Sequence, residues 1–385
     1  MIIKSLLDSD LYKLTMGQVV FFDFPNVWVH YSFTNRGGTQ FPSGFADALN
    51  MELRELNYLR MTPKESRWMK NLPYFRRAFV EWFSGYQFDY NEVMVIQTGG
   101  NLSIDVDGYW YRTIHWEVVL MAMVSELYFK MTGQVMASDA FGKIDIKGKK
   151  LEDAGCFWSD FGTRRRFSFD VQNEVVSRMR YYDGFLGTSN PYLAMIHGVN
   201  PIGTSAHEAP MAMQAIYGVR NSNRKWLEHW YNFYRGELGV ALTDTITTDV
   251  FLKDFDGLMA RIYDGTRHDS SDPYVWGEKI LDHYKKLSIS PLTKSLVFSD
   301  GLDTDKFIDI SKTFAPRVRR VVGGIGTHFT NDVGVKPLNI VIKLMTVSVD
   351  TASPSIDVVK LSDTPGKHNG SPEAIANVKY QLNIQ

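Results

Sequence analysis

The sequence has little cysteine, little net charge and no long apolar run, and each lack excludes a class of protein. Cys156 is the only cysteine among 385 residues, so no disulfide can form within the chain, which fits a reducing compartment. The formal net charge is −1, which gives no overall basic field for nucleic acid. The most apolar stretch, VVLMAMV at 118–124, is far shorter than the ~20 residues that a membrane span needs. We therefore expect a cytoplasmic protein that binds neither nucleic acid nor membrane.

Motifs of several enzyme classes are also missing. The sequence contains no CxxC and no HExxH, and its nine histidines are scattered, which argues against a transition-metal centre. No G-x-S-x-G elbow of a serine hydrolase is present. Neither a Walker loop nor a GxGxxG turn at the start of a helix occurs. The chemistry must therefore come from residues outside these patterns.

The residues that are present predict a large α/β protein. Hydrophobic residues make up 44% of the chain and charged residues 22%, which suits a globular protein with a substantial core. Residues 27–33 alternate between apolar and polar side chains as a half-buried strand does, and 45–60, 74–83 and 115–131 have helical patterns. The chain thus begins with a mixed region of strand and helix.

From residue 240 onward, short β-rich runs alternate with helical segments. The expected strands are 240–244, 261–265, 295–300, 318–324 and 338–345. Such alternation predicts right-handed βαβ units and therefore a parallel sheet. An α/β barrel and a doubly wound open sheet both satisfy this pattern.

Polar, glycine-containing motifs follow the expected strands directly. Because the carboxyl ends of parallel strands converge on one face, we expect these motifs to meet in a single site. Solvent-exposed loops alone do not explain so regular a placement. The motifs are GTSAHE at 203–208, TDTITTD at 243–249, DGTRHDSSDP at 264–273, SDGLD at 299–303 and GGIGT at 323–327.

His207 is the residue of GTSAHE that most suggests chemistry. Small residues precede it, which leaves the imidazole open to close approach by a ligand. A surface turn is the plainer alternative, but the position at a strand end favours a nucleophile or a proton carrier. In GGIGT, backbone N–H groups and the Thr327 hydroxyl suit an anion such as phosphate, although glycine-rich turns are common.

Three consecutive arginines in FGTRRRFS, at 161–168, suggest recognition of an anion. Arginine donates pairs of hydrogen bonds to carboxylates and phosphates. The plainer alternative is a solvated basic turn whose arginines pair with local acids. Phe161 and Gly162 argue against that alternative, because they indicate close and partly apolar packing. Ser168 is expected to cap the helix that follows.

Acidic residues at three strand ends have two interpretations each. The carboxylates of GTRHDSSDP, at 265–273, suit a ribose or a hydrated Mg²⁺. Alternatively, Ser271 or Asp272 caps a helix with the following proline in its first turn, and both interpretations can hold together. Asp244 and Asp300 likewise contact a sugar or magnesium, or cap the helices that follow them.

Taken together, these motifs resemble those of the nicotinate phosphoribosyltransferases, the type II phosphoribosyltransferases of NAD salvage. The similar stretches occur in the family's order and run nearly end to end. Ser271 departs from the pattern, because the family usually has glycine there, and the NRGGTQFP loop has no close match. The stretches are DSDLYKLTM at 8–16, FGTRRRFS at 161–168, GTSN at 187–190, PIGTSAHE at 201–208, LTDTITTDVFLKDF at 242–255, TRHDSSDP at 266–273, LVFSDGLD at 296–303, GIGT at 324–327, KPLNIVIKL at 336–344 and KLSDTPGK at 360–367.

The resemblance implies a reaction and a fold. Nicotinate and phosphoribosyl pyrophosphate would give nicotinate mononucleotide and pyrophosphate, coupled to the hydrolysis of ATP to ADP and phosphate with Mg²⁺. A smaller N-terminal mixed α/β domain, placed at 1–130, would pack on an irregular α/β barrel domain at 131–385 that takes in some early sequence. Homodimers occur in the family, and the sequence leaves the oligomeric state of this chain and the ligands of Mg²⁺ open.

The same resemblance implies roles for individual residues. His207 would be phosphorylated by ATP, with Asp244 as the acid that orients its imidazole. Tyr12 and Phe161 would stack on the two faces of the pyridine ring. The remaining implied contacts are Thr204 and Arg267 to nicotinate, with Arg267 also near the phosphoribosyl group, Arg164 and Arg165 to substrate anions, Asp269 and Asp300 to ribose and magnesium, and Gly326 and Thr327 to phosphate.

Three rival functions stay open. Nicotinamide phosphoribosyltransferases share the fold, but there an aspartate follows the Gly-Thr of the GTSN position and accepts the amide, whereas Ser189 follows here. A non-catalytic sensor of phosphoribosyl compounds would not need His207, Arg267 and Asp269 intact. A magnesium-dependent sugar-phosphate hydrolase would use the same aspartates without His207. The missing acid and the nearby arginines favour a base that carries a carboxylate.

Overall fold

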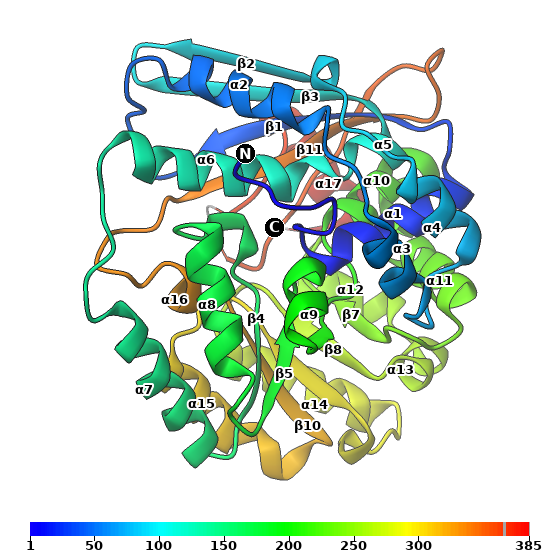
Figure 1. Cartoon of the computed structure of the whole chain (residues 1–385). Helices are drawn as coiled ribbons and strands as arrows, with labels where there is room; N and C mark the ends of the chain where they lie inside the picture. The colour runs from blue at the N-terminus through cyan, green and yellow to red at the C-terminus, as the bar shows by residue number, and fades with distance from the viewer. Residues whose placement is uncertain (365–366, 385) are drawn as a thin grey trace.

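A seven-stranded parallel sheet is the largest feature of the computed structural model, which describes residues 1–364 and 367–384 (Figure 1). The strand order is β6-β5-β4-β10-β9-β8-β7, and every neighbouring pair is parallel. The sheet is curled, and it stays open because β6 and β7, at the two ends of this order, do not pair with each other. It is therefore a half-barrel. The predicted α/β class is therefore confirmed. The bounds are β4 Phe157–Asp160, β5 Phe185–Thr188, β6 Asn200–Pro201, β7 Val240–Leu242, β8 Gly265–His268, β9 Ser295–Phe298 and β10 Arg320–Ile325.

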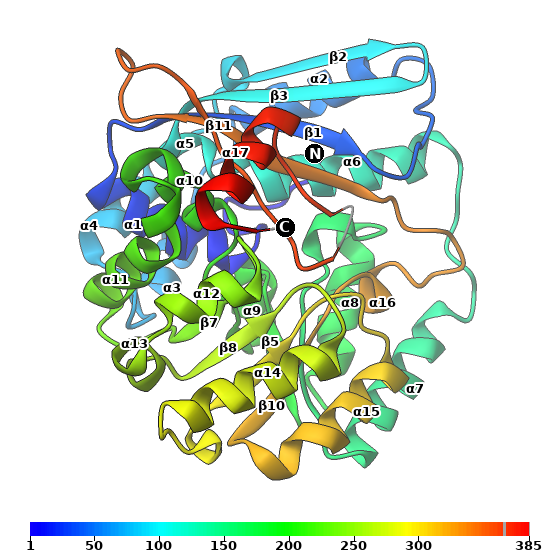
Figure 2. The ribbon, with the colours of Figure 1, turned by 180° about the vertical axis from the view of Figure 1, so that it is seen from behind.

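A second, antiparallel sheet has the order β12-β11-β1-β3-β2 (Figures 1 and 2). The strand predicted at 338–345 is present as β11, but its expected place in the parallel series is wrong, because it pairs antiparallel with β1. Its burial largely alternates along the strand, as in a strand with one face on the core. The bounds are β1 Trp28–Asn35, β2 Val93–Thr98, β3 Asn101–Tyr109, β11 Ile340–Ser348 and β12 Ile356–Asp357.

Helices fill the space between the sheets and cover their outer faces (Figures 1 and 2). Helix α6 is buried on nearly all sides, as its apolar sequence predicted. The early helices are α1 Leu11–Asp23, α2 Phe45–Leu56, α3 Pro63–Lys70, α4 Arg77–Ser84, α5 Trp110–Thr113, α6 Trp116–Met131, α7 Ala140–Asp153, α8 Phe169–Met179 and α9 Pro191–His197. The later helices are α10 Glu208–Tyr217, α11 Ser222–Tyr234, α12 Thr248–Asp254, α13 Gly257–Ile262, α14 Pro273–Lys286, α15 Thr304–Phe314, α16 Thr327–Thr330 and α17 Pro372–Leu382.

Two predicted helix caps are confirmed. The Ser168 hydroxyl accepts the Val171 N–H at the start of α8, at 3.2 Å. Asp272 accepts two N–H groups at the start of α14, and a proline follows it in the first turn. Helices α12 and α15 are capped by Thr247 and Asp303, so Asp244 and Asp300 are not the caps of the helices that follow them.

One predicted strand is misplaced. Residues 261–262 end helix α13, and the strand expected at 261–265 begins only at Gly265. The reason is local, because the Asp256 side chain accepts the Leu258 and Met259 N–H groups at 3.0 Å and so starts a helix. In GGIGT, residues 323–325 belong to β10 and do not form a loop after it.

The antiparallel sheet joins distant parts of the chain. Strands β1 to β3 come from the first 130 residues, whereas β11 and β12 come from beyond residue 339. The domain boundary at residue 130 stays a prediction. Pro365 and Gly366 of the KLSDTPGK motif lie outside the described residues. Within the described chain, no helix has both the length and the apolar character needed to cross a membrane.

Candidate active site

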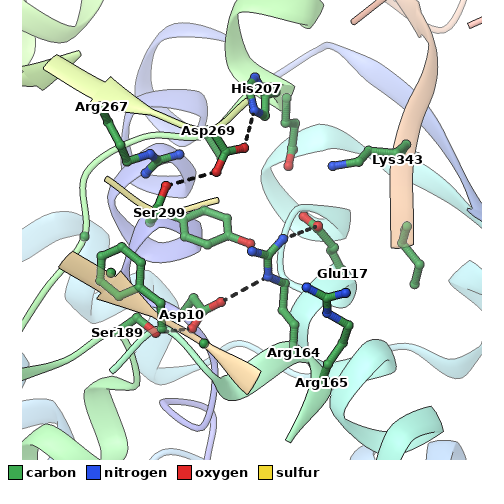
Figure 3. Close-up of a pocket in the computed structure, with 18 of the residues that line it drawn as sticks. Asp10, Glu117, Arg164, Arg165, Ser189, His207, Arg267, Asp269, Ser299 and Lys343 are labelled. Carbon is green, nitrogen blue, oxygen red and sulfur yellow. Dashed lines mark hydrogen bonds and ion pairs between the residues drawn. The ribbon is translucent and has the colours of Figure 1, made fainter. Parts of the chain in front are cut away.

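A cavity of about 170 Å³ opens where the carboxyl ends of the parallel strands face the antiparallel sheet. Residues that directly follow β4, β5, β8, β9 and β10 line it. Helix α1 contributes Tyr12. Strand β11 contributes Lys343 (Figure 3). Four of the five polar motifs reach the cavity directly, and TDTITTD lies behind His207, so the motifs do meet as expected.

Three of the twelve residues predicted for the site do not line the cavity. The Thr204 hydroxyl donates to the Val240 carbonyl at 3.1 Å. Asp244 is buried behind His207, and Asp300 pairs with Lys367 at 3.0 Å. The nine that line it are Tyr12, Phe161, Arg164, Arg165, His207, Arg267, Asp269, Gly326 and Thr327.

Two glycines make room for the aromatic side of the site. A Cβ on Gly324 would lie 2.3 Å from the Phe161 ring, so this position beneath the ring admits no side chain. Gly203 has φ +155°, and a Cβ there would lie 3.3 Å from the Tyr12 backbone nitrogen. The bare backbone of GTSAHE therefore allows the turn to pack closely against the start of α1, which carries Tyr12.

The three consecutive arginines have different surroundings. Arg166 is fully buried and makes two hydrogen bonds to the Asp8 carboxylate, at 2.6 and 3.0 Å, so it stabilises the fold. Arg164 lies between Asp10 and Glu117, at 3.7 and 3.8 Å. These separations are too long for hydrogen bonds, which leaves the guanidinium donors of Arg164 available to a ligand. The three arginines therefore do not form a solvated turn, and not all of them are available to bind a ligand.

Arg165 also lines the cavity, beside Arg164. Burial, together with the charge of Arg164, lowers the pKa of Arg165 to about 10. The guanidinium stays charged at neutral pH, and two adjacent cations at one wall favour a ligand with negative charge. Arg267 lines the opposite part of the cavity (Figure 3), and its buried Nε has no hydrogen-bond partner in the described chain.

His207 is held by hydrogen bonds to both ring nitrogens. Nδ1 lies 3.1 Å from the Thr245 hydroxyl, and Nε2 lies 2.8 Å from Asp269 Oδ2 (Figure 3). The resemblance implies an orienting role for Asp244, but its Oδ1 is 3.8 Å from Nε2, beyond hydrogen-bond length. Burial and the nearby Lys360 lower the pKa of His207 to about 4, so the imidazole is neutral at pH 7.

Asp269 joins the histidine to the cavity. Burial opposes ionisation, but the hydrogen bond with His207 and the charge of Lys360 hold the pKa of Asp269 well below its usual range. Its other oxygen accepts the Ser299 hydroxyl at 3.0 Å. The carboxylate is 30% exposed and remains accessible to a ligand hydroxyl.

Four charged residues of the site carried no signal at a strand end. Asp10 accepts the Ser189 hydroxyl at 2.5 Å, and burial raises its pKa. Lys343 points into the cavity from β11 (Figure 3), where burial lowers its pKa to about 8. Asp10, Lys343 and Lys360 lie in motifs that carry the resemblance, but only the folded chain places them in the site. The four are Asp10, Glu117, Lys343 and Lys360.

The donor groups offer a test of whether magnesium resides in the protein itself. Within the described chain, side-chain atoms of His207, Asp244 and Asp269 lie within 4.8 Å of one another. The Lys360 ammonium is 2.8 to 3.8 Å from all three, so a cation already occupies their centre. With Lys360 in place, this cluster does not fit a resident Mg²⁺.

The fold and site together define an α/β protein whose cavity suits an anionic ligand between aromatic and basic side chains. The model of the nicotinate phosphoribosyltransferase (NAPRTase) family matches residues 156–385, and that of its N-terminal domain matches residues 7–125. The chain therefore belongs to the nicotinate phosphoribosyltransferase family, and the resemblance noted in the sequence is confirmed.

Relatives from other organisms match this chain over nearly its full length. A nicotinate phosphoribosyltransferase of Desulforapulum autotrophicum is 44% identical over 380 residues, which cover 97% of each chain. One from Chromohalobacter salexigens is 41% identical and covers 99% of this chain and 98% of its own. The crystal structure of the nicotinate phosphoribosyltransferase from Porphyromonas gingivalis superposes with a TM-score of 0.97 at 38% identity and covers all of both chains.

Proposed function

We propose that this protein transfers the phosphoribosyl group of phosphoribosyl pyrophosphate to nicotinate in the salvage of NAD. The pyridine nitrogen forms a bond to C1 of the ribose while the bond from C1 to the pyrophosphate oxygen breaks, and pyrophosphate leaves with the electron pair. The observation that supports this best is the meeting of Tyr12 and Phe161 with Arg164, Arg165 and Arg267 in one cavity. Two aromatic rings suit a flat pyridine, and arginines suit its carboxylate and the phosphates.

Nicotinamide is the second candidate base, because the acid Asp10 lines the cavity beside Ser189. A carboxylate there can accept an amide N–H. However, Asp10 already accepts the Ser189 hydroxyl and lies 3.7 Å from Arg164. A neutral amide would also lose a charge-assisted contact with arginine, at a cost of about 1.5–3 kcal/mol. We therefore expect nicotinate to be used far better than nicotinamide.

ATP enters the proposal through His207. The neutral imidazole has a lone pair at pH 7, which is what a nucleophile toward the γ-phosphorus of ATP needs. Attack by the nitrogen releases ADP, and later hydrolysis of the phosphohistidine returns phosphate and the free imidazole. A phosphoryl group beside the cavity would add negative charge that Arg267 can bind.

Mg²⁺ would enter bound to the phosphates of ATP and phosphoribosyl pyrophosphate, where it neutralises charge and assists the leaving group. Asp269, exposed at the cavity, is the carboxylate of this cluster best placed to meet such a complex or the ribose hydroxyls. Tyr12 reaches the cavity from the same chain as Phe161, so the proposal needs no residue of a second copy, although a homodimer is compatible with it.

Product analysis tests the proposal. The protein is supplied with phosphoribosyl pyrophosphate and Mg²⁺, with nicotinate or nicotinamide, and with or without ATP. We expect nicotinate mononucleotide as the main product and faster formation with ATP. Comparable kcat/KM for the two bases would contradict the choice of base. A rate of nicotinate mononucleotide formation that ATP does not change would contradict the coupling. Hydrolysis of phosphoribosyl pyrophosphate without any mononucleotide would favour the hydrolase.

A further inference from the structure

Lys360 reaches the site from a segment outside the strand-end motifs. This segment lies beside the loop after β7, where the Leu361 N–H donates to the Thr245 carbonyl and the Thr247 N–H donates to the Leu361 carbonyl, at 2.8 and 2.9 Å. Lys360 and Asn369 exchange two backbone hydrogen bonds of 2.9 Å. The Lys360 side chain is only 10% exposed. The backbone on either side of Lys360 is therefore fixed, and its ammonium is directed inward.

The ammonium ends among three groups that could themselves hold a cation. Nζ lies 2.8 Å from His207 Nε2, 3.4 Å from Asp244 Oδ2 and 3.8 Å from Asp269 Oδ2. Oδ1 of Asp244 is buried and has no hydrogen-bond partner within the described residues. Two carboxylates thus face one ammonium, and they hold it against the imidazole.

Two contacts compete for His207 Nε2. The hydrogen bond to Asp269, at 2.8 Å, needs a proton on this nitrogen, whereas the Lys360 ammonium, also at 2.8 Å, can donate only to a lone pair. The Thr245 hydroxyl at Nδ1 can either accept or donate, so it satisfies both tautomers. When Lys360 is the donor, Nδ1 carries the proton and Nε2 has the lone pair that a nucleophile needs.

We propose that Lys360 acts in phosphoryl transfer to His207, where its ammonium stands in place of a resident metal ion. The inference rests on the proposed phosphorylation of His207. The Nε2 lone pair forms a bond to the γ-phosphorus of ATP, the bond from phosphorus to the bridging oxygen breaks, and ADP leaves with the electron pair. Lys360 exchanges its hydrogen bond to Nε2 for one to the phosphoryl oxygens. Nδ1 keeps its proton and donates it in a hydrogen bond to the Thr245 hydroxyl. Asp244 and Asp269 keep the ammonium within reach.

Metal binding tests the first half of the proposal without any turnover. Free Mn²⁺ is titrated against the full-length wild type and Lys360→Ala, and bound ion is followed by electron paramagnetic resonance. We expect Lys360→Ala to gain one site, at least tenfold tighter than any site in the wild type, because two carboxylates and an imidazole lose their ammonium. Adding Asp244→Asn to Lys360→Ala should remove that site. The proposal would be overturned if the wild type binds Mn²⁺ as tightly as Lys360→Ala does and if Asp244→Asn alone removes that site.

Phosphorylation tests the second half. With γ-labelled ATP and Mg²⁺, we expect Lys360→Met to form phosphohistidine at least tenfold more slowly than the wild type, and Lys360→Arg to recover part of that loss. Lys294→Met is the matched control, because Lys294 is also a buried lysine but donates to the Arg261 and Tyr263 carbonyls at the amino end of β9. It should lose stability without slowing phosphorylation.

The outcomes separate the two levels of the proposal. Labelling of wild type and Lys360→Met at the same rate would overturn the role of Lys360 and leave phosphohistidine intact. A wild type that makes nicotinate mononucleotide but takes up no label would instead overturn phosphohistidine itself. Thermal melting accompanies each variant, and if Lys360→Met does not fold, Lys360→Gln, which keeps a polar end group without the charge, replaces it in the same comparison.

Discussion

Two buried lysines of this protein each face a pair of carboxylates, but their surroundings differ in how many hydrogen-bond donors they provide. In the first group, called here the saturated cluster, Lys13 lies 2.7 Å from Glu117 and also bonds Glu208. Glu208 accepts the Tyr31 hydroxyl at 2.5 Å and the Trp110 indole N–H at 2.6 Å as well. Helices α1, α5, α6 and α10 and strand β1 are joined there. Tyr31, Glu117 and Glu208 also line the cavity, so this cluster holds one wall of the cavity to the core.

The second group, the unsaturated cluster, consists of Lys360, His207, Asp244 and Asp269. Its closest ion pair between an ammonium and a carboxylate is 3.4 Å, and one oxygen of Asp244 has no hydrogen-bond partner in the described chain. The residue types resemble those of the saturated cluster, so an ion pair by itself does not identify a structural or a chemical group. The two clusters differ in how many carboxylate oxygens still lack a hydrogen-bond donor, and a ligand can supply the missing donors.

The largest expected effect is in the unsaturated cluster, at His207. His207→Asn keeps a polar side chain beside Thr245 but has no imidazole, so we expect no phosphate label from ATP, while part of the base transfer remains. Transfer to nicotinate itself needs no histidine nucleophile. Mass spectrometry under alkaline handling, which preserves the acid-labile phosphate, checks the site in the wild type. Label on another residue, or full ATP-coupled turnover in His207→Asn, would show that the role is wrong.

The saturated cluster should respond in stability instead. Lys13→Met leaves two buried carboxylates without their cation, which is expected to cost about 3–5 kcal/mol in the free energy of unfolding. Urea unfolding measures this loss, and phosphorylation of the remaining folded protein should persist. Lys70→Met is the control, because its pair with Glu81 is exposed and 3.7 Å long, and pairs of that kind contribute about 0–1 kcal/mol. A loss in Lys13→Met no larger than in this control would remove the contrast between the clusters.

The parallel half of the site was predictable from sequence because strand ends converge. Polar motifs at those ends had to meet once the sheet was parallel, and most of the predicted residues do line the cavity. The orienting acid was placed at Asp244 and not at Asp269, since both follow strands and only the fold of the two loops decides which oxygen reaches the ring. Likewise, the turn at Thr163–Arg165 decides that Arg164 faces the cavity and Arg166 the core.

The remaining part of the site comes from elsewhere in the chain, and the pattern of polar motifs at strand ends does not predict it. Lys343 belongs to a strand that looked like one more parallel strand, but its pairing with β1 carries it across the cavity. Lys360 depends on backbone pairing between distant segments, near Ile246 and Leu361. Long-range pairing of this kind is not encoded in the periodicity of either segment.

Tyr12 sharpens the comparison, because it is the immediate neighbour of Lys13 but belongs to the cavity. Tyr12→Ala should raise the KM for nicotinate about threefold to tenfold, since aromatic stacking contributes about 0.5–1.5 kcal/mol beyond area burial. The stability loss should be much smaller than for Lys13→Met, as measured by thermal melting. A large loss of stability with an unchanged KM would instead assign Tyr12 to the core of α1.

The smallest expected effect is at Ser271, in the loop that carries Asp269 and Ser270. Its φ is +74°, a left-handed conformation that costs an L-residue about 1–2 kcal/mol, whereas glycine adopts it freely but loses about 0.5–1 kcal/mol in chain entropy. Ser271→Gly should therefore stabilise the protein by about 0.5–1 kcal/mol in urea unfolding. The two backbone hydrogen bonds of Ser271, to the Thr364 hydroxyl and from the His268 ring, do not involve its side chain and should survive.

Ser288→Gly is the matched control for this last change, because Ser288 also has a positive φ, +54°, but lies after α14, outside the loop that carries Asp269 and Ser270. Equal stabilisation by both variants would mean that relief of backbone strain is the whole effect. Ser270 donates to Asp244 at 2.6 Å, so a looser backbone at the next residue could disturb the unsaturated cluster. Slower phosphorylation of His207 in Ser271→Gly but not in Ser288→Gly would show that the strained serine holds Asp244 in place. Ser271, an uncharged residue, would then belong to the unsaturated cluster.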